Sequence, residues 1–330
     1  DNVNFSGNSG DGIRASTASS IDGLTITDSS FNNNPGDDSS GIEVYQNEDT
    51  PGLLNDVVIK DTEFIGNGQK GIYTEKLSNA TIENVTVDGV ISDTNGFNTG
   101  IDINLKYDDY ENITIRDSTV ANISEGDPFR DDPSFSSAIA VKARDDRSSY
   151  DGNPATLADV TVENVVIEDS FNGLRIGEPG VTYSAGPSGP SNVTITNSTF
   201  QNNSGFHIED VPGDLDLSAT LSTQSNSFDR TVTIADTEGT LTDGIFSSIQ
   251  TSVTAADAGD TIEVGSGTFN ESVTIEKANL TLEGPNAGIA GDSNDRGPEA
   301  TITDGVDVRN STVTLDGLEV RNPGEQGAAN

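Results

Sequence analysis

The sequence predicts an all-β solenoid, a parallel β-helix, because one short motif recurs through its first two thirds and polar corners separate its strands. The clearest copy, residues 192–206, reads Asn-Val-Thr-Ile-Thr-Asn-Ser-Thr-Phe-Gln-Asn-Asn-Ser-Gly-Phe. Its first strand recurs at intervals of 33, 23, 33, 47 and 33 residues, at Ile26, Ile59, Ile82, Ile115, Val162 and Ile195. Self-similarity on this length scale is typical of stacked repeats. Period-2 alternation bounded by Asn, Gly and Asp indicates strands rather than helices.

Each repeat supplies three strands with inward apolar residues, and such a unit buries its apolar face only by stacking on its neighbours. We therefore expect three ladders of stacked side chains, the first made of the six residues given above. The second ladder consists of Phe5, Phe31, Phe64, Val87, Val120, Ile167 and Phe200. The third ladder consists of Ile13, Ile42, Ile72, Ile101, Ile139, Leu174 and Phe206. After these residues the pattern weakens, and we expect one irregular last coil.

The chain divides into three segments by the character of its sequence. Residues 1–230 hold the coils, and they begin in mid-coil at Val3, as expected of a processed product or an excised piece of a longer chain. Thr, Asp and Gly dominate residues 231–245, which we expect to be a linker. In residues 246–330, apolar residues at i, i+3 and i+7 predict a short helix near 246–256, and short strands follow it.

The third segment carries a series of helix and strand motifs: Phe246-Ser-Ser-Ile-Gln-Thr-Ser-Val253, Gly259-Asp-Thr-Ile-Glu-Val264 and Leu280-Thr-Leu-Glu-Gly284. This series resembles the opening of the pectin-lyase-like right-handed β-helix proteins, in which an amphipathic helix plugs the N-terminal end of the coil. The repeats in residues 1–206 are similar to the generic parallel β-helix repeat of the same superfamily. The resemblance implies a right-handed coil, in agreement with the rule for parallel crossovers. In this sequence, however, the segment that resembles the opening, residues 246–284, comes after the repeats.

Acidic residues dominate the charge of the chain, which has 16 Lys and Arg residues against 55 Asp and Glu residues and a net charge of −39 at pH 7. Such repulsion destabilises a compact state at low ionic strength, whereas at molar salt the Debye length falls to about 3 Å. We therefore expect the protein of a halophilic microbe or of its virus. The alternative is an acidic protein that binds cations. Nucleic acid is not an expected partner, because phosphate binding needs clustered Lys and Arg.

Some residue types are missing or rare in the sequence. It has no Cys and no Met and a single His, so disulfides are excluded and ligands for soft metals are few. It also has no run of 18 apolar residues, so we expect no membrane span in this segment.

The densest group of cations lies in and beside the longest insertion, at Arg130, Lys142, Arg144 and Arg147. Pectate lyases of the resembled superfamily use an Arg base and Asp-bound Ca²⁺ on an acidic sugar. The resemblance therefore makes these four residues a candidate carbohydrate-binding site. Lys142 and Arg144 alternate with apolar strand residues, so we expect them to point outward as an exposed patch. The alternative is ion pairing within a solvated loop.

One turn near the C-terminal end has the pattern of a metal-binding loop. Oxygen-bearing side chains at Asp292, Asn294, Asp295 and Glu299 flank a Gly, which suits Ca²⁺. Arg296 stands where a ligand is expected, so an acidic surface turn is the alternative. No organic cofactor is indicated, and Ca²⁺ is the one ion that the residues suggest.

Eleven Asn-x-Ser/Thr sequons suggest an N-glycosylated surface protein. They lie at Asn4, Asn79, Asn84, Asn112, Asn122, Asn192, Asn197, Asn202, Asn270, Asn279 and Asn310. The alternative is that the repeat pattern alone produces these motifs, because Asn is the corner residue and Thr is an outward strand residue. We expect some of the eleven to carry glycans.

These observations favour a non-enzymatic, extracellular structural protein of a cell surface, a stiff rod whose partners are cell-surface glycans and other copies of itself. Unpaired end strands are templates for another chain, so we expect head-to-tail association into a filament or tandem array, with residues 246–330 docking on another copy. The alternative arrangement is that residues 246–330 fold back under residue 3 of the same chain. The first alternative is a polysaccharide-binding or polysaccharide-cleaving, lyase-like protein. The second alternative is a cation-binding surface protein.

The net charge generates a prediction about salt. We expect the protein to lose its folded structure on dialysis to low ionic strength and to regain it in molar KCl, because salt screens the repulsion among its carboxylates. Circular dichroism follows the transition. A spectrum that stays the same between about 0.05 and 3 M salt would contradict the halophilic interpretation.

Overall fold

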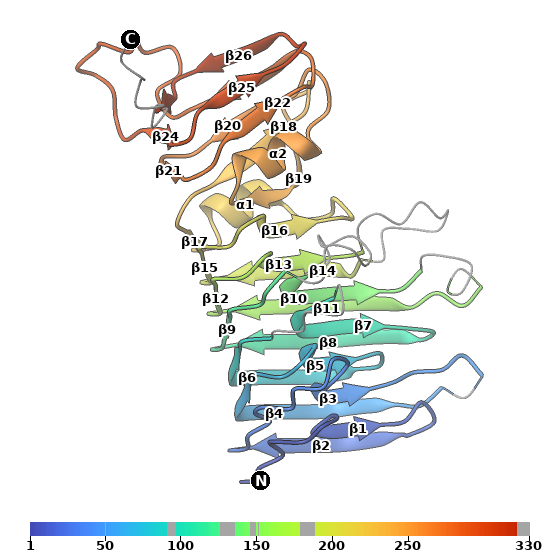
Figure 1. The fold of residues 1–330 in the computed structure, drawn as a ribbon. Coiled ribbons are helices and arrows are strands. Elements are labelled where there is room, and N and C mark those ends of the chain that lie inside the picture. Colours follow the sequence, from blue (N-terminus) through green and yellow to red (C-terminus); the bar gives the residue numbers. More distant parts are fainter. Residues whose placement is uncertain are drawn as a thin grey trace. The chain divides into compact units, whose positions relative to one another are not determined.

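A computed structural model describes residues 1–49, 51–90, 97–125, 136–145, 150, 152–178 and 189–321 (Figure 1). The chain folds as two compact units. The first comprises residues 1–204 and 208–227, and the second comprises residues 205–207 and 228–330. Parallel strands dominate both units, with two short helices, so the predicted all-β solenoid is confirmed.

The first wall of the first unit has the ladder that the repeat spacing predicts. Its strands are β2 (Ile21–Thr27), β4 (Leu54–Ile65), β6 (Ser78–Asp88), β8 (Asp109–Arg116), β11 (Thr156–Glu163) and β14 (Ser191–Thr196). Parallel pairing places all six predicted residues in one register, from Ile26 to Ile195. The unequal repeat lengths therefore do not disturb the register of this wall.

The second wall contains the C-terminal halves of β4 and β6, followed by shorter strands. These are β9 (Thr119–Ala121), β12 (Val166–Glu168), β15 (Thr199–Gln201) and β17 (Ser227–Phe228). The rings of Phe5, Phe31 and Phe64 stack at centroid distances of 4.8 and 5.0 Å, one coil spacing apart. From Phe64 to Phe200 the predicted ladder is continued in register.

The third wall confirms its predicted ladder except at the last residue. Its strands are β1 (Ile13–Ala15), β3 (Ser40–Val44), β5 (Lys70–Thr74), β7 (Thr99–Leu105), β10 (Ser137–Ala143), β13 (Leu174–Ile176) and β16 (Phe206–Asp210). Leu174 pairs with Ile208, so the expectation that Phe206 ends this ladder is wrong. Alternation cannot separate the two positions, because a shift of two residues keeps every side chain on the same face.

Polar residues turn the corners between the walls. Six corner residues have φ between 49° and 53°, in the left-handed region that Asn and Asp tolerate: Asp28, Asp61, Asn84, Asp117, Asn164 and Asn197. Inside the coil, the Nδ2 of Asn34 donates to the Oδ1 of Asn67 at 3.0 Å, which links buried amides of neighbouring coils. At Gly41 a Cβ atom would lie 2.6 Å from the Phe64 ring, so only Gly fits this close approach.

The second unit contains the helix that the sequence predicts, α2 (Ile249–Ala255). Ser248 caps it by accepting from the backbone N–H of Thr251, and Glu271 accepts from the N–H groups of Ile249 and Gln250. The strands are β18 (Val232–Ala235), β19 (Leu241–Phe246), β20 (Thr261–Val264), β21 (Gly267–Phe269), β22 (Val273–Ile275), β23 (Leu280–Glu283), β24 (Ala300–Ile302), β25 (Val306–Val308), β26 (Val313–Asp316) and β27 (Glu319–Val320).

Two expectations about the join between the units need correction. Residues 231–245 are not a linker, because β18 and β19 pair there as an antiparallel hairpin. The sequence does not reveal these strands, because they are short and Thr, Asp and Gly interrupt the alternation of their apolar residues. The expected irregular coil contains a second helix, α1 (Leu217–Ser222), capped by the side chain of Asp216. Among the described residues, neither helix has the length and apolar character needed to cross a bilayer.

The ladder of the first wall generates a stability prediction. Ile115 is fully buried between Ile82 and Val162, so Ile115→Asp places an unpaired charge in a dry core at a cost of several kcal/mol. We expect the variant to be unfolded by circular dichroism in molar salt. The control is Thr114→Asp, one residue earlier on the outer face, which should keep its melting temperature within a few degrees. A folded Ile115→Asp protein would contradict the assignment of this wall.

Candidate functional site

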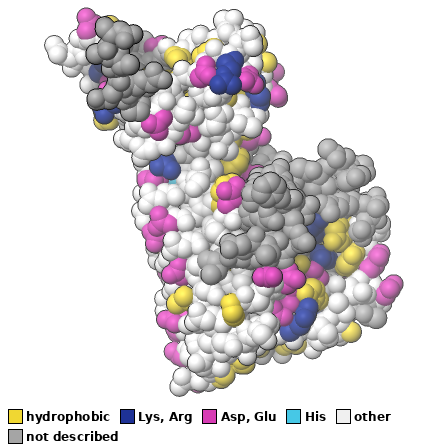
Figure 2. Space-filling view, in the orientation of Figure 1, with side chains coloured by type: hydrophobic (Ala, Val, Ile, Leu, Met, Phe, Trp, Pro, Cys, Tyr) yellow, Lys and Arg dark blue, Asp and Glu magenta, His cyan; other side chains and the backbone are white. Residues whose placement is uncertain are grey.

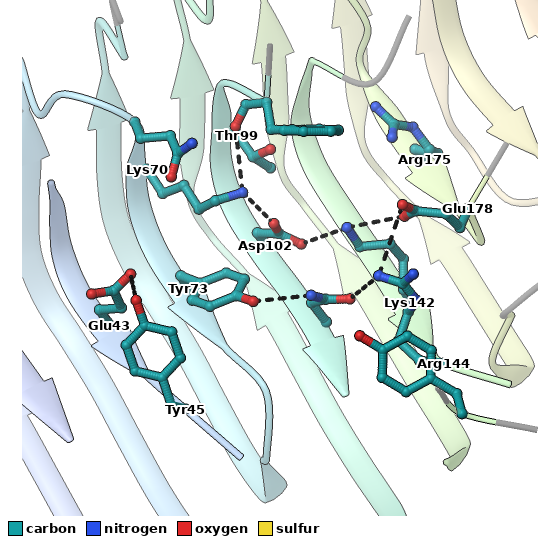
Figure 3. A pocket seen from close by; sticks show the side chains of 14 residues that line it. Glu43, Tyr45, Lys70, Tyr73, Thr99, Asp102, Lys142, Arg144, Arg175 and Glu178 are labelled. Atoms are coloured by element: carbon teal, nitrogen blue, oxygen red, sulfur yellow. Dashed lines mark hydrogen bonds and ion pairs between the residues drawn. The ribbon is translucent and has the colours of Figure 1, made fainter. Parts of the chain in front are cut away.

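A pocket of about 320 Å³ lies on the outer face of the third wall (Figure 3). It spans β3, β5, β7, β10 and β13, whose alternate residues point away from the apolar core. We call it the charged pocket, and its described lining is Glu43, Tyr45, Gln69, Lys70, Tyr73, Phe97, Thr99, Asp102, Asn104, Lys142, Arg144, Tyr150, Arg175 and Glu178. The parallel register aligns one outward column across these coils: Glu43, Tyr73, Asp102, Ala140 and Arg175.

Asp102 lies at the centre of the pocket, between two ammonium groups (Figure 3). The Nζ of Lys70 is 2.5 Å from its Oδ2, and the Nζ of Lys142 is 3.2 Å from its Oδ1. The same Lys142 Nζ is 3.2 Å from the Oε2 of Glu178, so this ammonium bridges two carboxylates on β7 and the segment after β13. All four side chains are more than nine-tenths buried.

This arrangement keeps both carboxylates ionised. Burial pushes the pKa of Asp102 upward, but Lys142 and Lys70 outweigh it and hold that pKa well below its usual range. Burial acts on Glu178 in the same way, and Lys142 and Arg144 lower the pKa of its carboxyl group below the ordinary value. Burial lowers the pKa of the Lys70 ammonium, although Asp102 opposes the shift.

A chain of hydrogen bonds continues the network toward β5. Arg144 donates from Nη1 to the Oδ1 of Asn104 at 3.2 Å, and Asn104 donates from Nδ2 to the hydroxyl of Tyr73 at 3.0 Å. Tyr73 in turn donates to Glu75 at 2.5 Å, and burial raises the pKa of Tyr73 well above its ordinary value. The Arg144 guanidinium also lies 4.7 Å from the ring centroid of Tyr150, within cation–π distance.

Glu43 forms the edge of the pocket on β3. Its Oε1 accepts from the Tyr45 hydroxyl at 2.6 Å, and the Nη2 of Arg14 donates to that hydroxyl at 2.9 Å. Burial, together with a hydrogen bond to Asp11, raises the pKa of Glu43 to about 7. Glu43 also lines a neighbouring acidic hollow of about 490 Å³ that includes Asp11 and Asp37, so it separates the charged pocket from a strongly negative surface.

The sequence expectations for this region are partly wrong. Lys142 and Arg144 do leave the core face, but each is only 7 % exposed, so the expected exposed patch is instead a buried ionic network. Neighbouring coils bring carboxylates and aromatic rings against them, which one strand's alternation does not reveal. Arg130 and Arg147 lie outside the described residues.

Sequence reasoning missed five charged members of the site, namely Glu43, Lys70, Asp102, Arg175 and Glu178. A signal for two of them was present, because Asp102 interrupts Ile101 and Ile103, and Arg175 interrupts Leu174 and Ile176. Aligning the repeats by outward column, as well as by inward ladder, would have placed these charges in one row.

Two of the four candidate Ca²⁺ ligands, Asp295 and Glu299, are bonded to neighbouring side chains. Arg296 binds Glu299 through Nε and Nη2 at 2.7 and 2.8 Å, so this carboxylate already has a cationic partner. Ser293 donates to Asp295 at 3.3 Å, as in an ordinary turn, and the remaining candidates are Asp292 and Asn294. Within the described ranges, no group of three His, Cys, Asp or Glu side chains is placed to hold a metal ion.

The eleven sequon asparagines are all exposed. Nine of them have positive φ: Asn79, Asn84, Asn112, Asn122, Asn192, Asn197, Asn202, Asn279 and Asn310. The corner geometry thus accounts for Asn at these positions without reference to glycosylation.

Residues 1–153 match the family model described as "Right handed beta helix region". No curated protein and no solved structure matches the chain. The family match supports the parallel β-helix superfamily and a right-handed coil, and it includes β3, β5, β7 and β10 of the charged pocket.

The raised pKa of Glu43 generates a prediction about pH. Because its folded-state pKa of about 7 lies above the ordinary value of 4.5, the folded state binds this proton more tightly. The resulting stabilisation is complete below the unfolded pKa and is lost as the pH rises through about 7. We expect Glu43→Gln, which remains neutral, to flatten the fall in melting temperature between about pH 5 and pH 8.

The matched control for this measurement is Glu111→Gln, an exposed carboxyl group on the first wall. It should keep the wild-type dependence of melting temperature on pH. An unchanged slope in Glu43→Gln would show that Glu43 does not carry the proton.

Proposed function

We propose that the chain is an exported, non-enzymatic β-helix protein of a high-salt environment that binds an acidic, cell-surface polysaccharide in the charged pocket. One observation carries the proposal. Four of the sixteen cations in a chain of net charge −39 line this single pocket: Lys70, Lys142, Arg144 and Arg175. In Figure 2, by contrast, Asp and Glu side chains are scattered over the visible face and Lys and Arg side chains are few.

The chemistry of the lining suits an acidic sugar. Arg175 is paired with Glu209 at 3.0 Å, which leaves three cations beside the three carboxyl groups of Glu43, Asp102 and Glu178, and protonation of Glu43 gives the cations an excess. Arg and Lys recognise carboxylates, whereas Tyr45 and Tyr73 present apolar ring faces with a polar hydroxyl. The volume of about 320 Å³ is within the usual range for small ligands.

The energetic cost of the network also supports a binding role. Removing an ion from water costs several kcal/mol, and apolar residues of similar volume often stabilise a protein more than a buried ion pair does. Lys142, Asp102 and Glu178 nonetheless form such a network on the outer face of a coil whose core is already apolar. Perturbed charged groups collected in a pocket are typical of functional sites.

Binding without cleavage is the form of this proposal that the pairing of the charged groups favours. General acid–base catalysis uses a group that exchanges a proton with the substrate near the working pH. Asp102 and Glu178 are held ionised by cations, and the Lys70 amine donates to Asp102 and to the carbonyl of Phe97. Glu43, with a pKa of about 7, is already bonded to Tyr45.

A structural role through head-to-tail association remains a second proposal. Val308, Leu315 and Val320, on β25, β26 and β27, are each 42 to 44 % exposed, and Val3 of the first coil is 41 % exposed. These apolar groups favour contact between copies of the chain, because burying them removes apolar surface from water. The residues proposed for this contact and those that line the charged pocket are different, so the two proposals can be tested separately.

The binding proposal is tested with uronate oligosaccharides in molar salt. We expect calorimetric binding of an oligogalacturonate, and a loss of about tenfold to hundredfold in affinity for Arg144→Gln, since hydrogen bonds to charged groups contribute about 1.5–3 kcal/mol. A neutral cello-oligosaccharide should bind more weakly. Salt should weaken binding only in part, because buried charges are screened less than exposed ones.

The control variant is Arg116→Gln, which removes a partly exposed Arg paired with Glu83 on the first wall and should bind as the wild type does. No binding, or an equal loss in both variants, would refute the proposal. The same mixtures are followed for the unsaturated sugars that a lyase releases, and their formation by wild type but not by Arg144→Gln would replace binding with catalysis. Light scattering of these samples reports head-to-tail association.

A further inference from the structure

The corner asparagines of successive coils are bonded to one another along the outside of the first unit. The Nδ2 of Asn112 donates to the Oδ1 of Asn79 at 2.9 Å, and the Nδ2 of Asn79 donates to the Oδ1 of Asn55 at 2.9 Å. Asn55 in turn donates to the Oδ1 of Asp22 at 2.8 Å. These amides therefore form a ladder that runs across four coils.

Other sequon asparagines donate to carboxylates in the same manner. The Nδ2 of Asn84 is 2.5 Å from the Oδ1 of Asp61, and the Nδ2 of Asn122 is 2.7 Å from the Oδ1 of Asp88. Asn192 donates to Asp159 at 3.2 Å. We call the five asparagines that donate in this way the laddered sequons: Asn79, Asn84, Asn112, Asn122 and Asn192.

A second set of sequons is outside these ladders. The open sequons are Asn4, Asn197, Asn270, Asn279 and Asn310, all exposed. In the part of the chain that the structure describes, their Nδ2 atoms donate no hydrogen bond. Where their side chains bond, they do so through oxygen, as when the Oδ1 of Asn4 accepts from the N–H of Ser6 at 2.9 Å.

The chemistry of N-glycosylation distinguishes the two sets. A bond forms between Nδ2 and the C1 carbon of the sugar, while the bond from C1 to the phosphate oxygen of a lipid-linked donor breaks. The lipid phosphate leaves with the bonding electrons, and Nδ2 gives up one proton to a base. The amide nitrogen must loosen its conjugation with the carbonyl to attack. A ladder opposes that step, because it holds the amide against a neighbouring coil only about 4.8 Å away.

We propose that the folded chain accepts N-glycans at its open sequons and excludes them from its laddered sequons. The proposal rests on export, which is part of the proposed function, but it does not depend on the charged pocket. The Asn-x-Ser/Thr motif then occurs in this chain for two different reasons. The laddered asparagines serve the coil, and the open asparagines serve as modification sites.

The test is glycopeptide mass spectrometry on the full chain secreted by an N-glycosylating host. We expect occupancy at the open sequons to exceed that at the laddered sequons by about fivefold where the laddered asparagine donates to an amide and by at least about tenfold where it donates to a carboxylate, the effects of a neutral and a charge-assisted hydrogen bond on a rate. Equal occupancy of the two sets, or no glycan at any sequon, would overturn the proposal. Neither result bears on sugar binding in the pocket, which the calorimetric experiment tests separately.

A variant converts one laddered sequon into an open one. Asp61→Gly removes the carboxylate that Asn84 contacts, and Gly retains the left-handed corner, where Asp61 has a φ of 51°. We expect a gain of glycan at Asn84. The matched control is Asp28→Gly, the same corner one coil earlier with a φ of 50°, which should leave Asn84 unmodified. A folded Asp61→Gly protein without glycan at Asn84 would refute the mechanism.

Discussion

In-register stacking of parallel coils is the constraint on which the rest of the structure depends. Once Ile59 pairs with Ile82 and Ile82 with Ile115, every other position of the coil is fixed in a column as well. Inward columns become apolar ladders, corner columns become Asn and Asp in the left-handed region, and outward columns become rows of side chains about 4.8 Å apart. The charged pocket and the asparagine ladders are therefore consequences of the same backbone pairing that forms the core.

The same columns explain how a very acidic chain holds a compact group of cations. Lys70, Lys142 and Arg175 come from three different coils, yet the register brings them to one pocket beside Asp102 and Glu178. Each of these residues is buried, so salt screens their interactions less than those of the exposed acidic surface. The chain thus combines an acidic exterior, whose charges salt can screen, with a local site whose electrostatics are set by neighbouring protein groups.

The sequence was sufficient to predict the repeats and their stacking, because inward residues obey a strict alternation. It was not sufficient at Phe206 and Ile208, because both positions fit the same alternation. It was also not sufficient in residues 231–245, where polar residues interrupt the apolar alternation of the hairpin strands. The pocket escaped prediction for a different reason. Its residues lie one per strand on the outer face, and only the register between coils places Asp102 beside Lys70 and Lys142.

The unequal coils have a consequence for how such a protein can change. Coils of 23 and 47 residues continue one register from Ile59 to Val162, so the loops of a coil can differ in length without shifting its strands. Doubling the length of a loop costs only about 0.6 kcal/mol in closure entropy. Segments can therefore be inserted or exchanged at one coil while the stacked walls are kept, in natural divergence or in laboratory grafting. The loops of each coil can therefore vary in length and sequence, whereas the inward residues are constrained by stacking on the neighbouring coils.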